Sequence, residues 1–423
     1  MGQAHPTPTK KPAAPSLSTS WKVISITAKG SQRYTPEEVT AASGLQLGQM
    51  ADESDFKKAT ERLGETGVFG DVSYGFQYSS AGAKVELNVS DGAQLVPARF
   101  DNFVWFPDDE LQKMLHEQVP LFKDGLLPVA GDLSDQVSNI LQALLIQNKV
   151  QGQADYVRAG RSGSIDSILF SVSAHTIHIR NTEFSGADAA DLPLLAAAAK
   201  RLEGQEYARS RVGAEEKHGF LPIYLERGHL KASFGGAQPK IVKDGEQETV
   251  VDVTIPVEPG LQYKLTQIDW AGNSAFTSEQ LQGLLQLKPG QVANAVLLDK
   301  DLVDVRRLYG TKGYMAPMIQ PKPEMQDSDS TVRYQIEVRE GDVYKMGELE
   351  IRGLDDKTKD RLLFNWRLKE GDTYNSGYIQ RFLDGTSSQL PKDVKWKIVP
   401  NEALNDDKTV DVTLRFESGG SQP

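Results

Sequence analysis

A few closely spaced histidines, aspartates and serines are the residues of this chain that could do chemistry. His175 and His178 could bind a metal ion, but on a strand residues three apart point to opposite faces, so one ion cannot easily reach both. Asp301 and Asp304 share a helix face suited to acid–base catalysis, yet neighbouring lysine and arginine favour an ordinary charged surface. The segment GRSGS (160–164) lacks the G-x-S-x-G spacing of a nucleophile elbow. We therefore predict a non-enzymatic protein without catalytic, cofactor or metal sites.

The composition narrows the class of protein further. The chain has 423 residues, of which 39% are hydrophobic and 25% charged, which is ordinary for soluble globular protein and long enough for several domains. A net charge of −11 with scattered lysine and arginine argues against a nucleic-acid partner. No apolar run approaches the about 20 residues of a membrane-spanning helix, so we expect no transmembrane segment. Cysteine is absent, which removes disulfides, thiolate zinc sites and cysteine nucleophiles.

The first twenty residues, MGQAHPTPTKKPAAPSLSTS, are rich in proline, threonine, serine and alanine. They contain no apolar core of a secretory signal, so no signal peptide is visible, although one removed upstream is left open. Their composition predicts a disordered N-terminal tether over residues 1–20.

A five-fold repeat organises the rest of the chain. The stretch LTQIDWAGNSAFTSEQLQGLLQLKPGQ (265–291) reads as a strand, a turn at Gly272, a helix, and a break at Gly290 eighteen residues later. The same spacing recurs in four further pairs: Gly30 and Gly48, Pro107 and Gly125, Gly186 and Gly204, and Gly353 and Gly371. Five copies of one internal spacing indicate a repeated structural unit.

Each copy continues in a similar way. A longer helical pattern follows the second glycine, then a variable strand, then a strongly alternating one such as VVDVTIPVEPG or VRYQIEVREG. Period-two alternation is typical of a strand with one buried face. We therefore predict an α+β fold of five tandem β-α-α-β-β modules in an elongated array. Each module is a three-stranded mixed sheet with two helices on one face. The predicted boundaries are 21–93, 94–174, 175–260, 261–341 and 342–419.

These patterns resemble the POTRA (polypeptide-transport-associated) domain family. The resemblance rests on the turn IDWAGNSAFTSEQL, the helix breaks LKPGQV and LKEGDTY, the turn LYGTKGYM, and the closing strand at 336–341. It covers residues 21 to about 419 and is strongest in the fourth and fifth copies. Five tandem units are similar to the periplasmic arm of BamA-type outer-membrane assembly proteins.

The resemblance implies a location and partners. It places the chain in the periplasm, or associated with the outer membrane, of a Gram-negative-type bacterium. Unfolded outer-membrane protein clients or envelope lipoproteins would be its partners, with an outer-membrane β-barrel as a further one. The printed chain ends without barrel strands, so a stand-alone protein and a part of a longer one both remain open. The expected function is a periplasmic scaffold for outer-membrane protein assembly or transport. The alternative is a rigid adaptor that docks folded envelope proteins in division or secretion.

The open edges of the predicted sheets are the expected working surface. An extended peptide can join such an edge through main-chain hydrogen bonds that ignore side-chain identity. In the fourth copy Pro317, Pro321 and Pro323 remove donors there, whereas the first and third copies are free of proline. We therefore predict receptive edges at Asp71, Val72, Ser73, Tyr74 and Phe76, and at His229, Leu230, Lys231, Ala232, Ser233 and Phe234. Ordinary solvent-exposed edges are the alternative.

Overall fold

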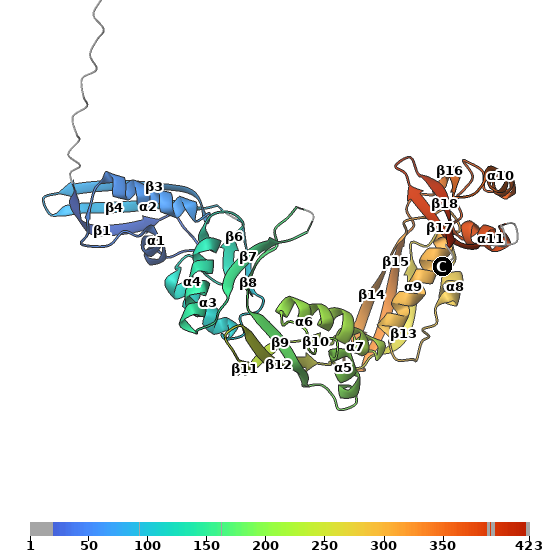
Figure 1. The fold of residues 1–423 in the computed structure, drawn as a ribbon, viewed down its shortest axis with the longest axis horizontal. Helices are drawn as coiled ribbons and strands as arrows, with labels where there is room; N and C mark the ends of the chain where they lie inside the picture. The colour runs from blue at the N-terminus through green and yellow to red at the C-terminus, as the bar shows by residue number, and fades with distance from the viewer. Residues whose placement is uncertain (1–19, 93, 162, 387–389, 391–393, 420–423) are drawn as a thin grey trace, which may run out of the picture. The chain divides into compact units, whose positions relative to one another are not determined.

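The chain is a mixed α+β protein built around five separate sheets (Figure 1). This computed structural model describes residues 20–92, 94–161, 163–386, 390 and 394–419. Apart from Ser20, the predicted tether over residues 1–20 lies outside the described residues. The α+β class predicted from the repeat pattern is confirmed at the level of elements.

The first sheet has the strand order β2-β1-β4-β3. Its elements are β1 (Trp21–Lys29), α1 (Pro36–Ser43), β2 (Met50–Ala51), α2 (Glu53–Glu65), β3 (Phe69–Ser79) and β4 (Gly82–Asp91). β1 runs parallel to β4, and β3 pairs with β4 in the antiparallel sense. Both helices begin with a capping box, in which Thr35 or Asp52 exchanges hydrogen bonds with the residue three positions later.

The second sheet has the order β6-β5-β8-β7. Its elements are β5 (Leu95–Phe100), α3 (Asp108–Gln118), β6 (Leu126–Pro128), α4 (Leu133–Gln147), β7 (Gln153–Ala159) and β8 (Ser167–Ser173). β5 ends at Phe100, before Trp105. The Asp101 N–H donates to the Phe170 carbonyl, and the Asn102 side chain continues the pairing with Val172. Trp105 therefore lies in a turn and not in the strand.

The third sheet is built on the long strand β12. Its elements are β9 (Thr176–Ser185), α5 (Leu192–Ala199), α6 (Arg209–Glu215), the π-helix η1 (Glu216–Phe220), α7 (Leu221–Glu226), β10 (Ser233–Phe234), β11 (Gln238–Asp244) and β12 (Glu248–Glu258). The strand predicted over His229–Phe234 forms only at its last two residues, which pair with Glu258 and Val257. The outer strand resumes at Gln238 after two glycines, whose lack of a side chain weakens a strand.

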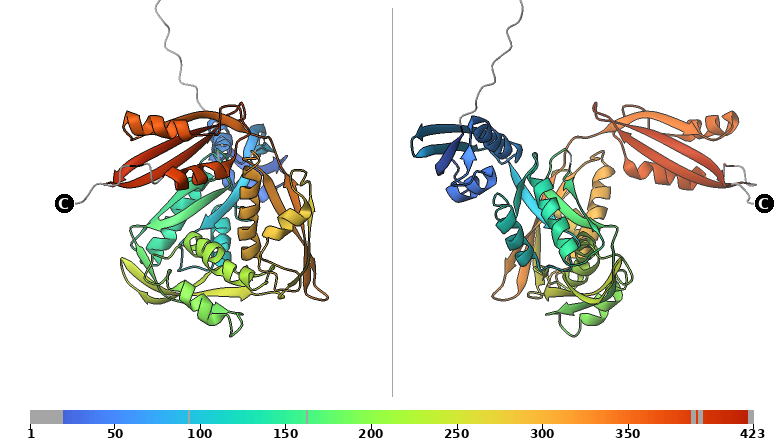
Figure 2. Two further views of the ribbon diagram at one scale, coloured as in Figure 1. Left: turned by 90° about the vertical axis from the view of Figure 1, so that its right-hand side faces the viewer. Right: turned by 60° about the vertical axis from the view of Figure 1, so that its left-hand side comes forward.

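The fourth and fifth sheets are three-stranded, with orders β13-β15-β14 and β16-β18-β17. The fourth has β13 (Lys264–Ala271), α8 (Ser278–Leu284), α9 (Ala295–Gly310), β14 (Met318–Gln326) and β15 (Thr331–Arg339). The fifth has β16 (Lys345–Arg352), α10 (Asp356–Asn365), α11 (Ser376–Thr386), β17 (Lys395–Leu404) and β18 (Thr409–Gly419). In the fourth, α8 and α9 lie on one side of the sheet (Figures 1 and 2). The first three sheets differ from the three-stranded prediction because a fourth short strand, β2, β6 or β10, joins each.

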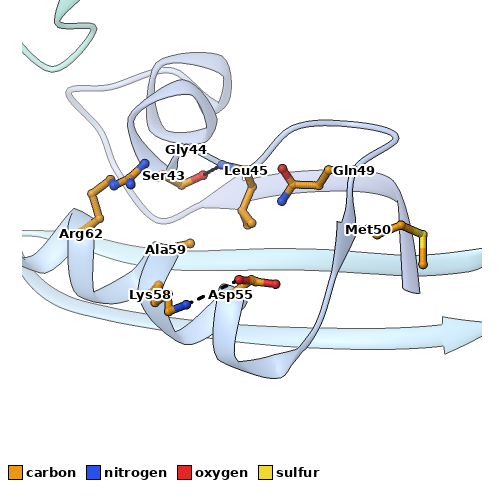
Figure 3. Close-up of a pocket in the computed structure, with 9 residues that line it drawn as sticks. All are labelled: Ser43, Gly44, Leu45, Gln49, Met50, Asp55, Lys58, Ala59 and Arg62. Atoms are coloured by element: carbon orange, nitrogen blue, oxygen red, sulfur yellow. Dashed lines mark hydrogen bonds and ion pairs between the residues drawn. The ribbon is translucent and has the colours of Figure 1, made fainter. Parts of the chain in front are cut away.

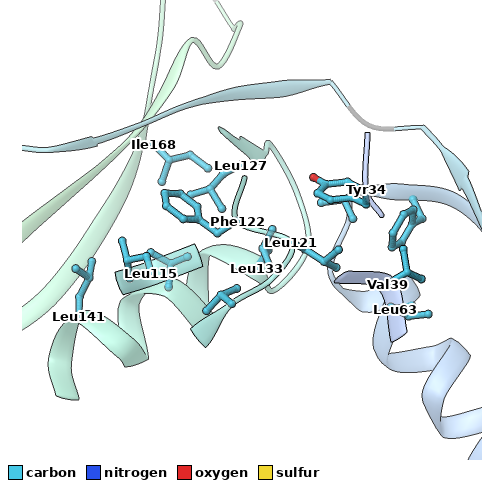
Figure 4. Packing of buried hydrophobic residues seen from close by; sticks show 14 of the residues in the cluster. Tyr34, Val39, Leu63, Leu115, Leu121, Phe122, Leu127, Leu133, Leu141 and Ile168 are labelled. Carbon is cyan, nitrogen blue, oxygen red and sulfur yellow. The ribbon is translucent and has the colours of Figure 1, made fainter. Parts of the chain in front are cut away.

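The chain divides into two compact units, and the division runs through the third sheet. The first unit comprises residues 1–183, 199–214 and 236–255, and the second comprises 184–198, 215–235 and 256–423. Within the first unit, one hydrophobic cluster extends from the first sheet into the second (Figure 4). Within the second unit, the fourth and fifth sheets have hydrophobic clusters of their own.

Candidate strand-binding edges

The two histidines considered as metal ligands lie in different environments. His175 is buried, and its Nε2 lies 2.9 Å from the Thr249 hydroxyl. His178 is part-exposed, and its Nε2 lies 4.0 Å from the Glu248 carboxylate. Among the described residues, no group of three or more histidines, aspartates or glutamates could hold a metal ion.

The buried histidine belongs to a polar relay that was not predicted from the sequence. The Thr249 hydroxyl donates to Asp244 Oδ1 at 2.6 Å, and the Trp105 indole N–H donates to the same oxygen at 3.3 Å. Trp105 also stacks edge-on against His175, with ring centroids 5.2 Å apart. Thr249 is fully buried and Asp244 is exposed, so the relay links a surface carboxylate to the buried histidine. No sequence motif could have predicted this relay, because its residues come from segments that are far apart in the chain.

The aspartates of α9 are structural. Asp301 is fully buried, and its Oδ2 accepts hydrogen bonds from the backbone N–H groups of Gln286 and Leu287. Asp304 forms a surface ion pair with Arg307 at 2.7 Å. The first carboxylate satisfies donors of the loop that follows α8, and the second is solvated, so the two do not form a catalytic pair.

The strand β3 lies at one edge of the first sheet, and β2 lies at the other. β3 runs for 11 residues without proline and pairs only with β4 among the described strands. Asp71 and Ser73 are exposed on the face of the sheet opposite the helices, where Gly75 and Gln77 also lie. Val72, Tyr74 and Phe76 are half-buried against α2.

The turn that joins β3 to β4 fixes which backbone groups of β3 remain open. Ser79 pairs with Gly82 across a two-residue turn, and such closing pairs are hydrogen-bonded to each other. Because bonding alternates along an antiparallel pair, Ser73 and Gln77 direct their N–H and C=O groups toward β4. Val72, Tyr74, Phe76 and Tyr78 direct theirs outward. The open backbone groups and the side chains facing α2 thus belong to the same residues.

Tyr74, in the predicted β3 edge, has a shifted pKa. Partial burial, together with the nearby Glu53 carboxylate that hydrogen-bonds the hydroxyl, raises the pKa of Tyr74 above its usual value. The phenol therefore stays neutral at physiological pH. Tyr74 thus adds no charge to the edge, and the nearby fixed charge on the helix side is that of Glu53.

The second predicted edge is placed differently. His229 is nearly buried and its Nδ1 lies 3.2 Å from the Gly260 carbonyl, while Leu230 packs against the hydrophobic cluster of the fourth sheet. Lys231 forms an ion pair with Asp327 at 2.6 Å, and Ala232 lies outside the strands. Only Ser233 and Phe234 lie in a strand, β10, where the Phe234 ring packs against Phe220 and Tyr224.

The outer strands of the other sheets differ in their proline content. β14 contains Pro321 and Pro323, as predicted, while β11 contains Pro239 and β17 contains Pro400. Because pairing continues along these strands, the prolines occupy positions whose nitrogen faces away from the neighbouring strand. They remove donors from the open edge. β7, β9, β13 and β16 also lie at sheet edges and are proline-free, but they span seven, ten, eight and eight residues, fewer than β3.

A pocket of about 250 Å³ lies between α1 and α2, beside the first sheet (Figure 3). Ser43, Leu45 and Ala59 line it together with the cations of Lys58 and Arg62. Lys58 lies 3.9 Å from Asp55, and the Arg62 guanidinium packs where a side chain at Gly44 would lie. Lys58 therefore has an acidic neighbour, and the Arg62 guanidinium forms part of the pocket wall beside Gly44. No helix among the described residues is both long and apolar enough to cross a membrane.

Comparison with known proteins gives a family match over part of the chain. Residues 263–341 match the POTRA family, described as surface antigen variable number repeat. A protein of Treponema pallidum named "Putative outer membrane protein assembly factor" is 24% identical over 196 residues, which are 46% of this chain and 23% of the relative. Outer membrane protein assembly factor BamA of Neisseria meningitidis is 25% identical over 219 residues, 48% of this chain and 26% of the relative. The matches thus span about a quarter of these relatives.

Two solved structures also align with the chain. POTRA domains 3–5 of Haemophilus influenzae BamA are 22% identical, with a TM-score of 0.42, covering 57% of this chain and 96% of that structure. The N-terminal domain of Omp85 from Thermosynechococcus elongatus is 16% identical, with a TM-score of 0.25, covering 58% and 98% respectively.

Proposed function

We propose, from the premise that residues 263–341 are a POTRA domain and that the chain is homologous to BamA-type POTRA regions, that this protein is a non-enzymatic scaffold for outer-membrane protein assembly. It binds extended strands of unfolded outer-membrane clients, or of envelope lipoproteins, by β-augmentation at open sheet edges. Its place is the periplasmic side of the outer membrane. Main-chain pairing suits this role because it accepts many client sequences and needs no cofactor.

The proposal includes five POTRA-like modules with the boundaries 21–93, 94–174, 175–260, 261–341 and 342–419. Five sheets support this division, and so does a contact repeated in four of them. The glycine after the first strand approaches a carbonyl of the closing strand so closely that a Cβ would lie 2.0–2.4 Å from the oxygen. This contact occurs at Gly30, Gly186, Gly272 and Gly353. The modules would share a turn at which only glycine fits, because any side chain would clash with the closing strand.

The observation that carries the function is the open edge of β3. It combines 11 residues, a terminal position in the sheet and the absence of proline. Four residues direct backbone donors and acceptors outward, enough to pair a client segment of about eight residues because alternate residues of a strand face each side. Ser233 and Phe234 are retained as a second, shorter candidate edge in the third module, since β10 pairs on one side only.

Site-specific photo-crosslinking tests the edge directly. A crosslinker at Ser73 should capture denatured outer-membrane strands, because an added strand runs about 5 Å from β3. Asn88, its cross-strand partner on the interior strand β4, is the matched control and lies one strand further from the client. Equal capture at both positions would argue against pairing at β3. Capture of folded envelope proteins alone would favour the rigid-adaptor alternative.

A proline substitution in β3 is the second test of strand pairing. Val72→Pro removes an outward N–H without breaking the ladder to β4, so client affinity should fall about tenfold, the value of one hydrogen bond together with the steric cost of the ring. Circular dichroism should stay unchanged, since the lost donor faces away from the fold. Undiminished client binding by a folded Val72→Pro protein contradicts the proposal.

A further inference from the structure

The open edge of β3 carries a row of aromatic rings on its helix-facing side. Tyr74, Phe76 and Tyr78 occupy alternate positions, and neighbouring rings lie 6.4 and 6.3 Å apart between centroids. Phe56 of α2 backs the first two at 6.2 and 5.2 Å. Trp21 of β1 stacks on the third at 5.1 Å. The row is therefore held in place before any partner arrives.

The rings are held but not covered. Tyr78 is 66% exposed, and Tyr74 and Phe76 are half-buried because α2 packs over one side of them only. These are also the residues whose backbone groups point outward from β3. A strand that pairs with the edge must place every second side chain directly beside this row, with Cβ atoms about 5 Å apart.

We infer that Tyr74, Phe76 and Tyr78 make this edge selective for strands with aromatic side chains at alternate positions. The inference rests on the proposed function, and it adds a side-chain preference to main-chain pairing. Aromatic cross-strand pairs stabilise a sheet beyond the contribution of the backbone. Rings already fixed by Phe56 and Trp21 lose little freedom on binding, which favours affinity.

The other face of β3 sets the second half of the preference. Asp71, Ser73, Gly75 and Gln77 point there, and these side chains are small or polar and exposed. The paired strand should therefore carry polar residues between its aromatic ones. The ligand class is an amphipathic strand, aromatic on one face and polar on the other, in one register with β3.

The described outer strands of the other sheets lack such a row. β7 has one aromatic residue, Tyr156, whose ring is covered by the Arg158 guanidinium at 5.5 Å. β17 has Trp396, which packs on Phe416. β9, β10 and β13 have one each, and β11, β14 and β16 have none. Selection for aromatic strands is accordingly assigned to the first module.

A set of matched peptides tests the selectivity on the full chain. One nine-residue peptide alternates tyrosine with serine and glutamine, a second has the same composition with the tyrosines contiguous, and a third replaces tyrosine by threonine. Fluorescence anisotropy should show the alternating peptide binding at least tenfold more tightly than either other. In the double variant Tyr74→Ser/Tyr78→Ser this ratio should fall below threefold, while affinity for the threonine peptide is kept. Gln77→Ser, on the opposite face of the same strand, is the control and should retain the full ratio.

The outcomes distinguish a failure of aromatic selectivity from a failure of strand pairing at β3. If the double variant keeps the tenfold ratio while Val72→Pro lowers the affinity for the peptides about tenfold, the aromatic row is not the determinant and the augmentation proposal stands. If Val72→Pro leaves binding of all peptides unchanged, strand pairing at β3 fails and the inference falls with it. If the double variant does not fold, Tyr78→Ser alone decides, because that ring is largely exposed and an unchanged ratio there overturns the inference.

Discussion

The paired glycines that recur along the chain have two distinct physical roles. Gly272 has a φ of 81°, and a Cβ on it would lie 2.2 Å from the Val338 carbonyl oxygen of the closing strand. Gly290 has a φ of 88°, but a Cβ there would meet nothing within 4 Å. The first position requires both the left-handed backbone and the missing side chain, and the second requires the backbone alone.

This difference predicts unequal costs of substitution. Gly272→Ala combines backbone strain with a clash against main chain and should destabilise the fourth module by about 2 kcal/mol or more. Gly290→Asn should cost less than about 1 kcal/mol, because asparagine tolerates the left-handed region. Hydrogen exchange of the amides in residues 263–341 measures the loss of stability in each variant. Equal protection in the two variants would contradict the separation of roles.

Single residues also show where sequence reasoning reached its limit. Asp301 was predicted to be an ordinary surface acid, whereas it is buried and bonds two loop amides. Its sequence neighbours Asp299 and Lys300 gave no sign of this, because burial is set by the loop that packs over it. The same holds for Thr249, whose partners His175 and Asp244 meet only in the folded chain.

At the scale of elements, local signals that act within a few residues were predictable. The capped start of α8 at Thr277 and the alternating burial of β15 both follow from the sequence pattern. The short strands β2 and β6 were not predicted, since two or three residues carry no periodicity. The third module's outer strand was placed too early because GHLKASF is compatible with a strand, but His229 and Leu230 pack inward against neighbouring residues instead.

Proline content makes an element-scale prediction about β14. Pro321 and Pro323 remove two outward donors from this edge while its pairing with β15 stays continuous. Pro321→Val/Pro323→Val restores both donors and should give the fourth module a measurable client-binding edge. We expect client crosslinking at the exposed Lys322 to rise at least threefold over the unsubstituted chain.

The matched control for β14 keeps one proline. Pro321→Val alone restores one donor, so its crosslinking yield should be intermediate. Yields that are the same in all three chains would show that missing donors do not close this edge, and would weaken the reasoning that selects β3.

At the scale of the whole molecule, the hydrophobic clusters indicate which modules unfold together. One cluster contains residues of both the first and the second sheet, from Val23 to Val172. Leu121 lies in it between Leu133 of α4 and Val39 of α1 (Figure 4). The fourth sheet has a separate cluster that includes Leu302 of α9. Shared apolar burial couples the stability of neighbouring modules, whereas separate clusters leave each module to open by itself.

Two leucine truncations test this coupling. Leu121→Ala should cost about 2–5 kcal/mol, as buried leucine truncations do, and should speed hydrogen exchange in both β1–β4 and β5–β8, because the cavity lies in a core that both sheets use. Leu302→Ala, equally buried, is the matched control and should speed exchange in β13–β15 while leaving the first two sheets unchanged. Faster exchange confined to the second sheet in Leu121→Ala would mean that the first module stands alone. Its open edge would then bind clients without support from the second module, and the Leu121→Ala protein should keep wild-type client affinity.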